Sequence, residues 1–565
     1  MPPDDPTVQA RGSDPPEPPG ATAVASDLDS TVTGQQAELT RQSAAQEPPG
    51  RDRSLGTDPV AWLIALVTFL AYTVISVFRY LRLDPGSWDL GIFTEYVKQA
   101  AHLHAPVVTI RGTGFNLLGA HFQPIVALIA PFFRLFPTPV TLLVAQALLT
   151  AISVIPVCRA ARELLGTWPS RGIGLAYGLS WGLQQMIDFD FHEIAFAVPL
   201  LAFSLSALVR RRLRPAVLWA LPLVFVKEDQ GFTIAAIGLL MAGMGLAQLR
   251  KMRNGVGPGE SLSRTLDDPS AWILAGVFLA VWGLAWSALA IEVIIPHFNP
   301  THHYPYWGNG GVIAPGGPMS LGAVGHQFAV AGTEKLWTVY LILLPVAFLA
   351  LRSPVALIAV PSLALRFVST NNYYWGDGWH YNATVMPIVF LAAIDGMARF
   401  RAASERRAAL CRPGGATPGT GRRARRRLPA PGEAVARYAA IVMVVIAGWT
   451  AFRFPLDGLW NSQTYAITPH VSAEDAAMAK VPDGVTVEAT LTMLAPLAAR
   501  DDTYWIGTSP NPAPQYIVFD NDDSGWAPAS NVLQFVEQRH TGYEYARIFL
   551  DNNVYVFRRI GRTGG

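Results

Sequence analysis

Ionisable residues that could do chemistry gather in two short segments of this 565-residue chain, each beside apolar stretches. Asp89, in the sequence SWDLG, carries a carboxylate that can take a proton from a hydroxyl group. Further along, Asp188–Glu193 reads DFDFHE. Carboxylates and an imidazole at this spacing suit a divalent cation, Mg²⁺ or Mn²⁺, held by Asp190, His192 and Glu193.

Both segments also fit other roles. The DFDFHE residues could hold the hydroxyls of a sugar acceptor, fix the charge of one catalytic group, or form a solvated loop. Their spacing is not HExxH, which excludes a zinc-protease motif. Asp89 precedes a stretch with the pattern of an amphipathic helix, LGIFTEYVKQAAHLH, so its alternative role is that of helix N-cap.

A third cluster, Lys227–Asp229 (KED), interrupts a long apolar region. Basic clusters on both sides of that region favour the cytoplasm for its two ends, which puts KED at the apex of a helical hairpin. The first arm, residues 215–226, is shorter than the roughly 20 residues that a membrane crossing requires. We therefore expect Lys227, Glu228 and Asp229 to line a cavity, since ionisable groups at membrane depth usually do. An exposed turn is the alternative.

Histidines and aromatic residues crowd the same predicted side. His121 lies in GAHFQP, His302 and Tyr304 follow another apolar run, and Trp375 and His380 lie in NNYYWGDGWH. Aromatic belts at a membrane interface explain such residues, and so does stacking against sugar rings. Their mixture with Asn, Asp and His favours carbohydrate.

The composition specifies the kind of protein that must position these residues. Hydrophobic residues make up 51% of the chain and charged residues only 15%, against roughly 25% in soluble domains. This deficit predicts a membrane protein. The net charge of +2 gives no support for nucleic-acid binding, and two cysteines exclude a disulfide framework or a multi-cysteine metal site.

We predict an α-helical polytopic membrane protein with about 11 transmembrane helices, a re-entrant or interfacial helix at 117–136, and a small C-terminal extracytoplasmic α/β domain. The candidate spans are 59–80, 139–158, 172–187, 194–209, 215–226, 231–249, 270–295, 335–351, 353–368, 383–398 and 436–452. The predicted domains are a disordered, proline-rich cytoplasmic N-terminus (1–57), a transmembrane domain (58–453) with a basic cytoplasmic loop (399–434), and the outer domain (454–565).

Alternating residues in the tail predict strands at 485–490, 516–520 and 554–559. Helical patterns lie between them at 491–499 and 531–540. Asp551-Asn552-Asn553 has the composition of a hairpin turn. The tail therefore has the pattern of a small α/β domain.

Four motifs in order resemble the bacterial DUF2079 family of membrane proteins. They are SWDLGIF (87–93), the GAHFQP-containing stretch 119–149, DFHE (190–193) and VKED (226–229). The likeness covers roughly residues 59–400 and extends to the tail. That family is grouped with the GT-C superfamily of membrane glycosyltransferases, so the resemblance implies a GT-C-like fold.

The resemblance also implies a reaction. GT-C enzymes use sugars linked to lipid phosphates, and an acidic residue in the first outer loop serves as base or metal ligand. Asp89 is the matching position, although Leu90 and Gly91 follow it where many members carry a paired acid. Asp89 would then deprotonate the acceptor hydroxyl, which attacks the anomeric carbon with inversion. Lys227 and His192 would stabilise the leaving phosphate.

The remaining candidates would bind substrate. They are His121, Asp190, Glu193, Glu228, Asp229, His302, Tyr304, Trp375 and His380. The implied partners are membrane lipids, a polyprenyl-phosphate-linked sugar and a cell-envelope glycan acceptor. The implied location is the cell membrane, with the N-terminus cytoplasmic and the C-terminal domain outside.

Two other functions remain open at this point. Broken helices and buried charges also suit a lipid or glycan transporter or flippase, although no inverted repeat is evident. A non-catalytic scaffold for envelope assembly is the second. Convergence of Asp89, DFHE and KED on one cavity favours the enzyme, and wide separation of DFHE and KED favours the scaffold.

Overall fold

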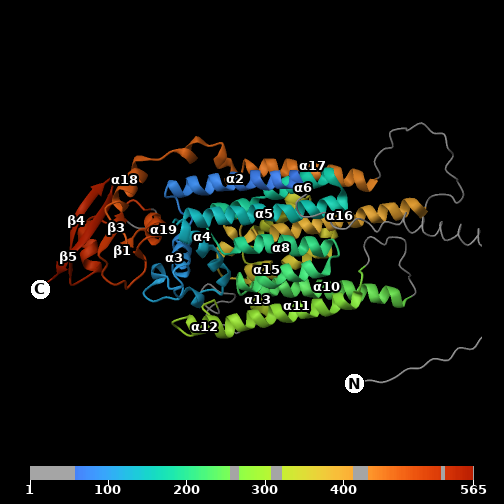
Figure 1. Ribbon diagram of the computed structural model, residues 1–565, viewed down its shortest axis with the longest axis horizontal. Coiled ribbons are helices and arrows are strands. Elements are labelled where there is room, and N and C mark those ends of the chain that lie inside the picture. The colour runs from blue at the N-terminus through green and yellow to red at the C-terminus, as the bar shows by residue number, and fades with distance from the viewer. Residues whose placement is uncertain (1–57, 255–265, 307–320, 411–430, 524–527, 564–565) are drawn as a thin grey trace, which may run out of the picture. The chain divides into compact units, whose positions relative to one another are not determined.

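The computed structural model describes residues 58–254, 266–306, 321–410, 431–523 and 528–563 (Figure 1). The predicted disorder of residues 1–57 and much of the predicted basic loop lie outside this part of the chain. From Val60 onward the chain forms one compact unit. Most of this unit is helical, and a small sheet follows at the C-terminal end of the chain.

The principal helices of the apolar part are α2 (Pro59–Leu81), α3 (Asp89–Ala101), α4 (Ala130–Leu135), α5 (Val140–Leu165), α6 (Thr167–Gly178), α7 (Trp181–Asp188), α8 (Ile194–Val209), α9 (Leu213–Ala220), α10 (Gln230–Arg253), α11 (Pro269–Leu289), α12 (Ile295–Phe298), α13 (Leu321–Ala329), α14 (Gly332–Leu343), α15 (Val360–Val368), α16 (Val385–Leu410) and α17 (Pro431–Ala451). A π-helical turn, Ala290–Ile294, joins α11 to α12. Every apolar run predicted from the sequence falls on these helices, and the runs 215–226, 335–351 and 353–368 also include adjoining 3₁₀ turns.

Six helices of the described residues are long and apolar enough to cross a membrane, and a seventh crossing results if α13 and α14, bent by 70°, form one span. The chain is thus a multi-pass membrane protein, but the predicted count of about 11 is not confirmed. Several predicted spans are short apolar helices instead, at residues 194–209, 213–225 and 354–368. Two of them begin or end as 3₁₀ turns with an early proline, because proline cannot donate the helical hydrogen bond. The segment 124–135 is also too short to cross.

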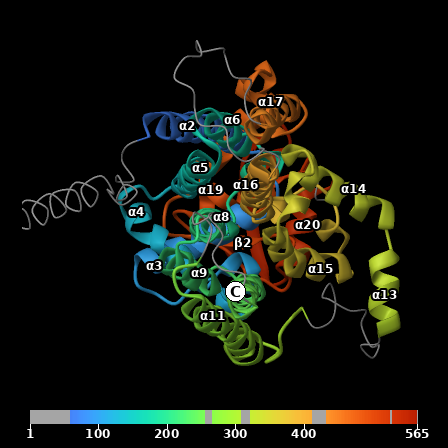
Figure 2. The ribbon, with the colours of Figure 1, turned by 90° about the vertical axis from the view of Figure 1, so that its right-hand side faces the viewer.

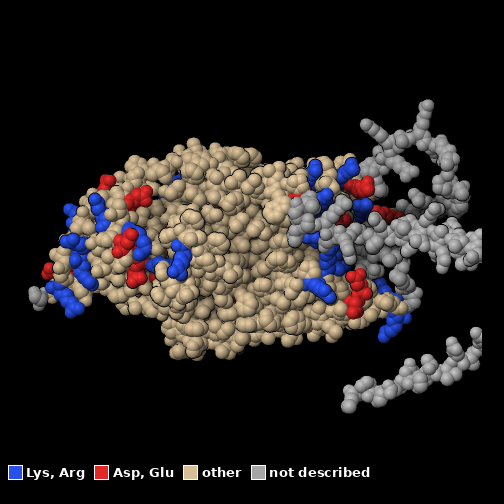
Figure 3. Space-filling model, in the orientation of Figure 1, with Lys and Arg blue, Asp and Glu red and all other residues tan. Residues whose placement is uncertain are grey.

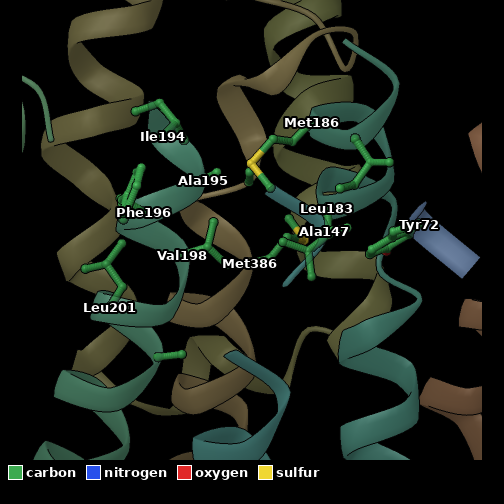
Figure 4. Packing of buried hydrophobic residues seen from close by; sticks show 14 of the residues in the cluster. Tyr72, Ala147, Leu183, Met186, Ile194, Ala195, Phe196, Val198, Leu201 and Met386 are labelled. Atoms are coloured by element: carbon green, nitrogen blue, oxygen red, sulfur yellow. The ribbon is translucent and has the colours of Figure 1, made fainter. Parts of the chain in front are cut away.

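An uncharged band runs across the helices between two charged ends (Figure 3). Viewed along the helices, α16 lies near the middle of the bundle (Figure 2) and contacts α5, α8 and α17. Buried side chains of α8, such as Ala195 and Val198, pack among Met186 and Met386 (Figure 4). This packing fixes the start of α8, where Glu193 lies.

The C-terminal sheet has the strand order β2-β1-β3-β5-β4. The strands are β1 (Thr486–Ala489), β2 (Asp502–Trp505), β3 (Tyr516–Asp520), β4 (Tyr543–Asp551) and β5 (Val554–Arg562). The first three are parallel, and β5 pairs antiparallel with both β3 and β4. Helices α18 (Pro469–Met478), α19 (Leu494–Ala498) and α20 (Val532–Arg539) pack beside the strands.

The sequence predicted β1, β3, β5 and the hairpin turn, where Asn552 and Asn553 both adopt positive φ angles. It missed β2 and β4. Strand β2 is only four residues long, and β4 is a largely exposed edge strand without clear alternation. A short or exposed strand carries little of the two-residue period on which the prediction depends.

The sheet contacts the helical part through α3 and the turn that follows it. Lys98 Nζ donates to the carbonyl of Asp501 (2.6 Å), and the Thr109 hydroxyl donates to the carbonyl of Thr503 (2.7 Å). The rings of Trp88 and Trp505 meet edge to face, 4.6 Å apart. The sheet therefore shares one end of the unit with α3, whose first residue is Asp89 (Figure 1).

Candidate functional site

A cavity of about 1020 Å³, open solvent included, lies beside the KED segment. One part of its wall carries basic side chains, namely His121, Lys227, Arg366 and His380. Another part is apolar and includes Ile194, Phe232, Ile291 and Leu365. Four tyrosines, Tyr304, Tyr306, Tyr374 and Tyr381, add hydroxyl groups. The cavity thus joins buried positive charge to a hydrocarbon surface.

A buried carboxylate links the DFDFHE and KED segments. Glu193 is fully buried, with Lys227 Nζ 3.0 Å from its Oε1 and His192 Nδ1 2.7 Å from its Oε2. Both contacts are close ion pairs. Neither oxygen of Glu193 has a partner with hydrogen-bond geometry among the described residues. Burial opposes the charge of Glu193, but the positive charges of His192 and Lys227 outweigh it and hold its pKa well below the usual range.

The opposite balance applies to Lys227. Burial disfavours its ammonium, but the carboxylates of Glu193, Asp229 and Glu228 outweigh burial and raise its pKa well above the usual value. Lys227 is therefore a permanent cation at the cavity wall, with its side chain only 15% exposed. Its place at the break between the 3₁₀ turn Leu221–Phe225 and α10 is the apex predicted from the sequence.

Gln146 of α5 shapes the DFDFHE turn. Its amide donates to the carbonyls of Met186 (3.1 Å) and Asp190, and its side-chain oxygen accepts from the backbone N–H of His192 (3.0 Å). These contacts accompany a positive φ of 75° at Asp190, a conformation uncommon for a residue with a side chain. Gln146 was not predicted as a site residue, although it is a polar residue inside the apolar run 139–158.

Asp190 connects this turn to the loop before Asp89. Its Oδ2 accepts from the backbone N–H groups of Gly86 (2.9 Å) and Ser87 (3.2 Å). Burial raises the pKa of Asp190 to about 7, against the positive charge of Arg79, and the nearby Asp89 adds to the increase. The carboxyl of Asp190 therefore changes charge near neutral pH.

Asp89 is the first residue of α3, and the N-cap position belongs to Trp88. The N-cap role considered from the sequence is thus not the one observed. Asp89 Oδ2 accepts from the Ser87 hydroxyl (2.7 Å). Asp89 lies near Asp190 and Tyr381, close enough for its charge to act on both, although it does not itself line the large cavity.

Glu228 organises the other side of the KED turn. Its Oε1 lies 2.7 Å from His121 Nδ1 and accepts from the Tyr304 hydroxyl (3.0 Å), while Oε2 accepts from the backbone N–H of Phe122 (3.1 Å). His121 Nε2 lies 2.6 Å from the Tyr306 hydroxyl. Burial disfavours the charge of Glu228, but His121 outweighs burial and lowers its pKa.

Two further basic residues complete the wall. The ring of His380 stacks on that of His192, with centroids 3.5 Å apart, and neither of its nitrogens has a hydrogen-bond partner among the described residues. Arg366 is buried, and it donates to the carbonyl of Tyr374 (3.0 Å) and to Asn382 Oδ1 (2.9 Å). Arg366 was not predicted from the sequence, although a charge inside the apolar run 353–368 was the available signal.

Five of the nine predicted binding residues line this cavity, namely His121, Glu228, Asp229, Tyr304 and His380. The other four, Asp190, Glu193, His302 and Trp375, are not among its lining residues. Trp375 is buried against Lys335 and donates its indole N–H to the carbonyl of Ser369, while its neighbour Tyr374 lines the cavity instead. His302 is exposed, at a position with positive φ, and is not among the lining residues. Asp229 does line the cavity, and burial raises its pKa.

The predicted metal set of Asp190, His192 and Glu193 is not among the groups whose ligand atoms lie close together in the described residues. The oxygens of Glu193 face Lys227 and His192, and Oδ2 of Asp190 accepts from the backbone of another loop. The described residues contain one group of three possible metal ligands whose ligand atoms lie within 4.8 Å of one another, and it consists of His470, Asp520 and Asp522. That group lies in the C-terminal domain.

Comparison with known proteins gives one family match. The family model DUF2079, described as a predicted membrane protein, matches residues 79–547. No curated protein matches the chain.

Three solved structures are similar to the chain at low identity. ArnT from Cupriavidus metallidurans bound to undecaprenyl phosphate is 13% identical, with a TM-score of 0.44 over 87% of this chain and 97% of that chain. The apo form of ArnT is 14% identical, with a TM-score of 0.46 over the same shares. The oligosaccharyltransferase of Archaeoglobus fulgidus, with zinc and sulfate, is 12% identical, with a TM-score of 0.36 over 88% of this chain and 73% of that chain.

Proposed function

This chain belongs to the DUF2079 family of predicted membrane proteins, and on that premise we propose that it is an integral-membrane glycosyltransferase. The donor is a sugar linked to a polyprenyl phosphate, and the acceptor is a glycan of the cell envelope. The reaction inverts the anomeric carbon and takes place on the extracytoplasmic face.

The observation that carries this proposal is the mixed character of the cavity wall. Arg366 is a buried cation and Lys227 a largely buried one, and the apolar side chains of Phe232, Ile291 and Leu365 line the same space. A ligand that complements such a wall has an anionic head and a hydrocarbon tail. A lipid-linked phosphate has this form, and the cations would stabilise the negative charge that develops on it.

Contact between DFDFHE and KED also supports an enzyme. Glu193 joins His192 to Lys227, and Asp190 joins this cluster to the loop of Asp89. A scaffold has no need to bury so many charges in contact, because desolvating each of them costs several kcal/mol. Strain at Asp190 and buried charge at one cavity are typical of a functional site.

The proposed step assigns one role to each group. Asp89 takes the proton from the acceptor hydroxyl as that oxygen bonds to the anomeric carbon. The bond between the anomeric carbon and the phosphate oxygen breaks, and its electron pair leaves with the phosphate. Lys227 and His192 stabilise the phosphate, while Glu193 keeps both of them in place. Asp190, Glu228 and His380 shape the binding site.

The proposed orientation follows the distribution of basic residues. The last turn of α10 carries Arg250, Lys251 and Arg253, and α16 carries Arg399 and Arg401 toward its C-terminal end. These helix ends lie opposite the C-terminal sheet (Figure 1). Basic residues are enriched on the cytoplasmic side of membrane proteins, which favours an outer position for the site.

The proposed cation requirement follows from the contacts of Glu193. Because the Lys227 ammonium and the His192 imidazole face its oxygens, we propose that these two side chains stabilise the phosphate and that added Mg²⁺ or Mn²⁺ is dispensable. Turnover measured with and without a chelator tests this point.

The experiment is release of labelled sugar from a panel of polyprenyl-phosphate sugars by the purified full-length protein in nanodiscs. Wild type is expected to turn over one donor, and Asp89→Asn to lose that turnover. The control is Asp457→Asn, in a 3₁₀ turn near the start of the outer domain. Lipid movement across a vesicle without sugar release would contradict the proposal and favour a flippase, and neither activity would favour a scaffold.

A further inference from the structure

A hydrogen-bonded chain of three residues ends at the cavity, and the proposed function so far uses only part of it. Glu228 Oε1 faces His121 Nδ1 at 2.7 Å, and His121 Nε2 faces the Tyr306 hydroxyl at 2.6 Å. The two rings are nearly parallel, with centroids 4.5 Å apart. All three residues line the cavity. The order carboxylate, imidazole, hydroxyl is an arrangement that moves protons in enzymes.

Glu228 is anchored well enough to orient the imidazole. Its carboxylate is buried and also accepts from the Tyr304 hydroxyl and the backbone N–H of Phe122. The backbone of Glu228 is itself fixed, since the Ser287 hydroxyl of α11 donates to its carbonyl (2.5 Å). Because His121 Nδ1 faces this carboxylate, Nδ1 carries a hydrogen, and Nε2 is the atom that exchanges a proton with Tyr306.

The Tyr306 hydroxyl lies where an anion would be bound. It feels the charge of Lys227 and lies near Tyr374, which lines the same wall. Burial raises the pKa of Tyr306, so its phenol keeps its proton at neutral pH. A protonated phenol beside an ammonium group is a hydrogen-bond donor for a phosphate oxygen.

We infer that Tyr306 donates a proton to the departing lipid phosphate and that His121, oriented by Glu228, replaces that proton. The inference rests on the proposed function, because a phosphate must leave within this cavity. Tyr306 is the catalytic residue, since it contacts the phosphate, and His121 and Glu228 are positioning residues that act through it.

The step balances in atoms and charge. Cleavage of the bond to the anomeric carbon leaves the lipid phosphate as a dianion. The Tyr306 O–H proton moves to a phosphate oxygen while the Nε2 proton of the His121 imidazolium moves to the Tyr306 oxygen. The products are a monoanionic lipid phosphate, an intact phenol and a neutral His121 still bonded to Glu228. His121, which is 21% exposed, then regains a proton from water.

Because each turnover draws one proton through this chain to the leaving phosphate, the transfer rate should fall as pH rises. Charged and titratable groups from every neighbouring segment act on this histidine. They are Glu228 and Asp229 of the KED turn, Glu193 before α8, and Tyr306 after α12. Lys227 acts on Tyr306, and the Tyr304 hydroxyl donates to Glu228. Removing the Tyr306 hydroxyl should abolish this dependence, because His121 then has no path to the phosphate.

The test that needs no turnover is a ³¹P NMR titration of undecaprenyl phosphate bound to the full-length protein in nanodiscs. A donor hydroxyl stabilises the dianion, so Tyr306→Phe should raise the midpoint of the bound phosphate by about one pH unit. His121→Gln should change it as well. Tyr465→Phe, an exposed tyrosine whose hydroxyl donates to the carbonyl of Leu459, should leave the midpoint at the wild-type value.

Each outcome separates the two proposals. If the wild type binds the lipid and Tyr306→Phe gives the same ³¹P midpoint, the inference is overturned and the proposed function is left intact. Failure of the wild type to bind undecaprenyl phosphate overturns both. Inorganic phosphate is the second probe. If Tyr306→Phe changes the midpoint of bound inorganic phosphate as much as that of the lipid, Tyr306 contacts a phosphate but the phosphate need not come from a lipid, which contradicts the lipid part of the inference.

The activity arm is the pH profile of kcat for sugar release. Wild type should lose rate at alkaline pH, and Tyr306→Phe should be slower by about 10²-fold and lack that alkaline limb. A structural role alone would lower the amount of folded protein without changing the shape of the profile. An unchanged profile in a folded Tyr306→Phe variant overturns the inference.

Discussion

The ammonium of Lys227 lies 3.0 Å from the carboxylate of Glu193, although the two residues belong to different helical turns. His192 occupies the other oxygen of the same carboxylate at 2.7 Å. Such buried pairs seldom add stability over an apolar pair of the same size, because desolvation offsets the attraction. Their presence at a cavity is better explained by the function of the charges.

Breaking this pair on one side should destabilise the protein, and removing both charges should not. Lys227→Met leaves Glu193 with one cationic neighbour, and we expect a loss of about 3–5 kcal/mol in the free energy of unfolding. Glu193→Gln should cost a similar amount. The double variant should recover much of the melting temperature while remaining inactive. Additive losses in the double variant would show that the pair has no coupling energy.

Arg366 should hold the shape of the loop that follows α15. Its guanidinium donates to the carbonyls of Tyr374 (3.0 Å) and Tyr381 (3.2 Å) and to Asn382 Oδ1 (2.9 Å). Lysine keeps the charge but lacks the planar set of donors, so Arg366→Lys should raise KM for the donor by about tenfold and speed proteolysis within residues 369–384. Exposed Arg134→Lys is the control. Equal proteolysis rates in wild type and Arg366→Lys would refute this role.

Glu95 should make stability depend on pH. Glu95 is fully buried in α3, and its Oε1 accepts a hydrogen bond from the Thr109 hydroxyl (2.5 Å). Burial raises the pKa of Glu95 to about 7, although this hydrogen bond and the charge of Lys98 act to lower it. The Thr109 hydroxyl has one hydrogen and also faces the carbonyl of Thr503 (2.7 Å). A protonated Glu95 can donate to Thr109 and leave that hydrogen for Thr503.

Because the folded pKa lies above the ordinary value of 4.5, the native state binds the proton more tightly than the unfolded state. Its contribution to stability is therefore complete at low pH and is lost as pH rises toward about 7. The melting temperature should fall between about pH 5 and pH 8, by less in Glu95→Gln than in wild type. Glu474, whose pKa burial also raises to about 7, keeps part of the slope in the variant. Parallel curves for the two proteins would exclude Glu95 as a source.

Close packing of α10 on α11 should position the KED turn. A Cβ at Gly231 would lie 2.1 Å from the carbonyl oxygen of Gly283, so Gly231→Ala must push the helices apart and should cost about 1–3 kcal/mol. Gly243→Ala in the same helix meets nothing within 4 Å and should stabilise by about 0.5–1 kcal/mol through helix propensity. Similar melting temperatures for the two variants would contradict this account.

Much of the helical part could be predicted because apolar runs bounded by basic clusters are strong signals. The approach of DFHE to KED also followed from topology, since both were predicted at the same side of the membrane. The number of crossings could not be predicted in the same way. Composition does not reveal that prolines convert the segments before α10 and α15 into short 3₁₀ turns.

Individual site residues were harder to predict than their region. Trp375 and Tyr374 are adjacent in the sequence, and only the local turn decides that Tyr374 faces the cavity while Trp375 packs on Lys335. Arg366 and Gln146 are polar residues in apolar helices, and their side chains point inward. The average composition of such a helix does not indicate where one polar side chain points. The metal set at Asp190, His192 and Glu193 stays a prediction, since spacing says nothing of which neighbours already face a carboxylate.

The proposed function requires the cavity beside Lys227 to bind a lipid-linked phosphate. A cryo-EM structure of the full-length protein in nanodiscs with undecaprenyl phosphate would show where the lipid binds. We expect the phosphate beside Lys227 and Tyr306, with the prenyl chain along Phe232 and Leu365. An empty cavity, with lipid phosphate bound only at the basic helix ends near Arg250, would contradict the proposed function.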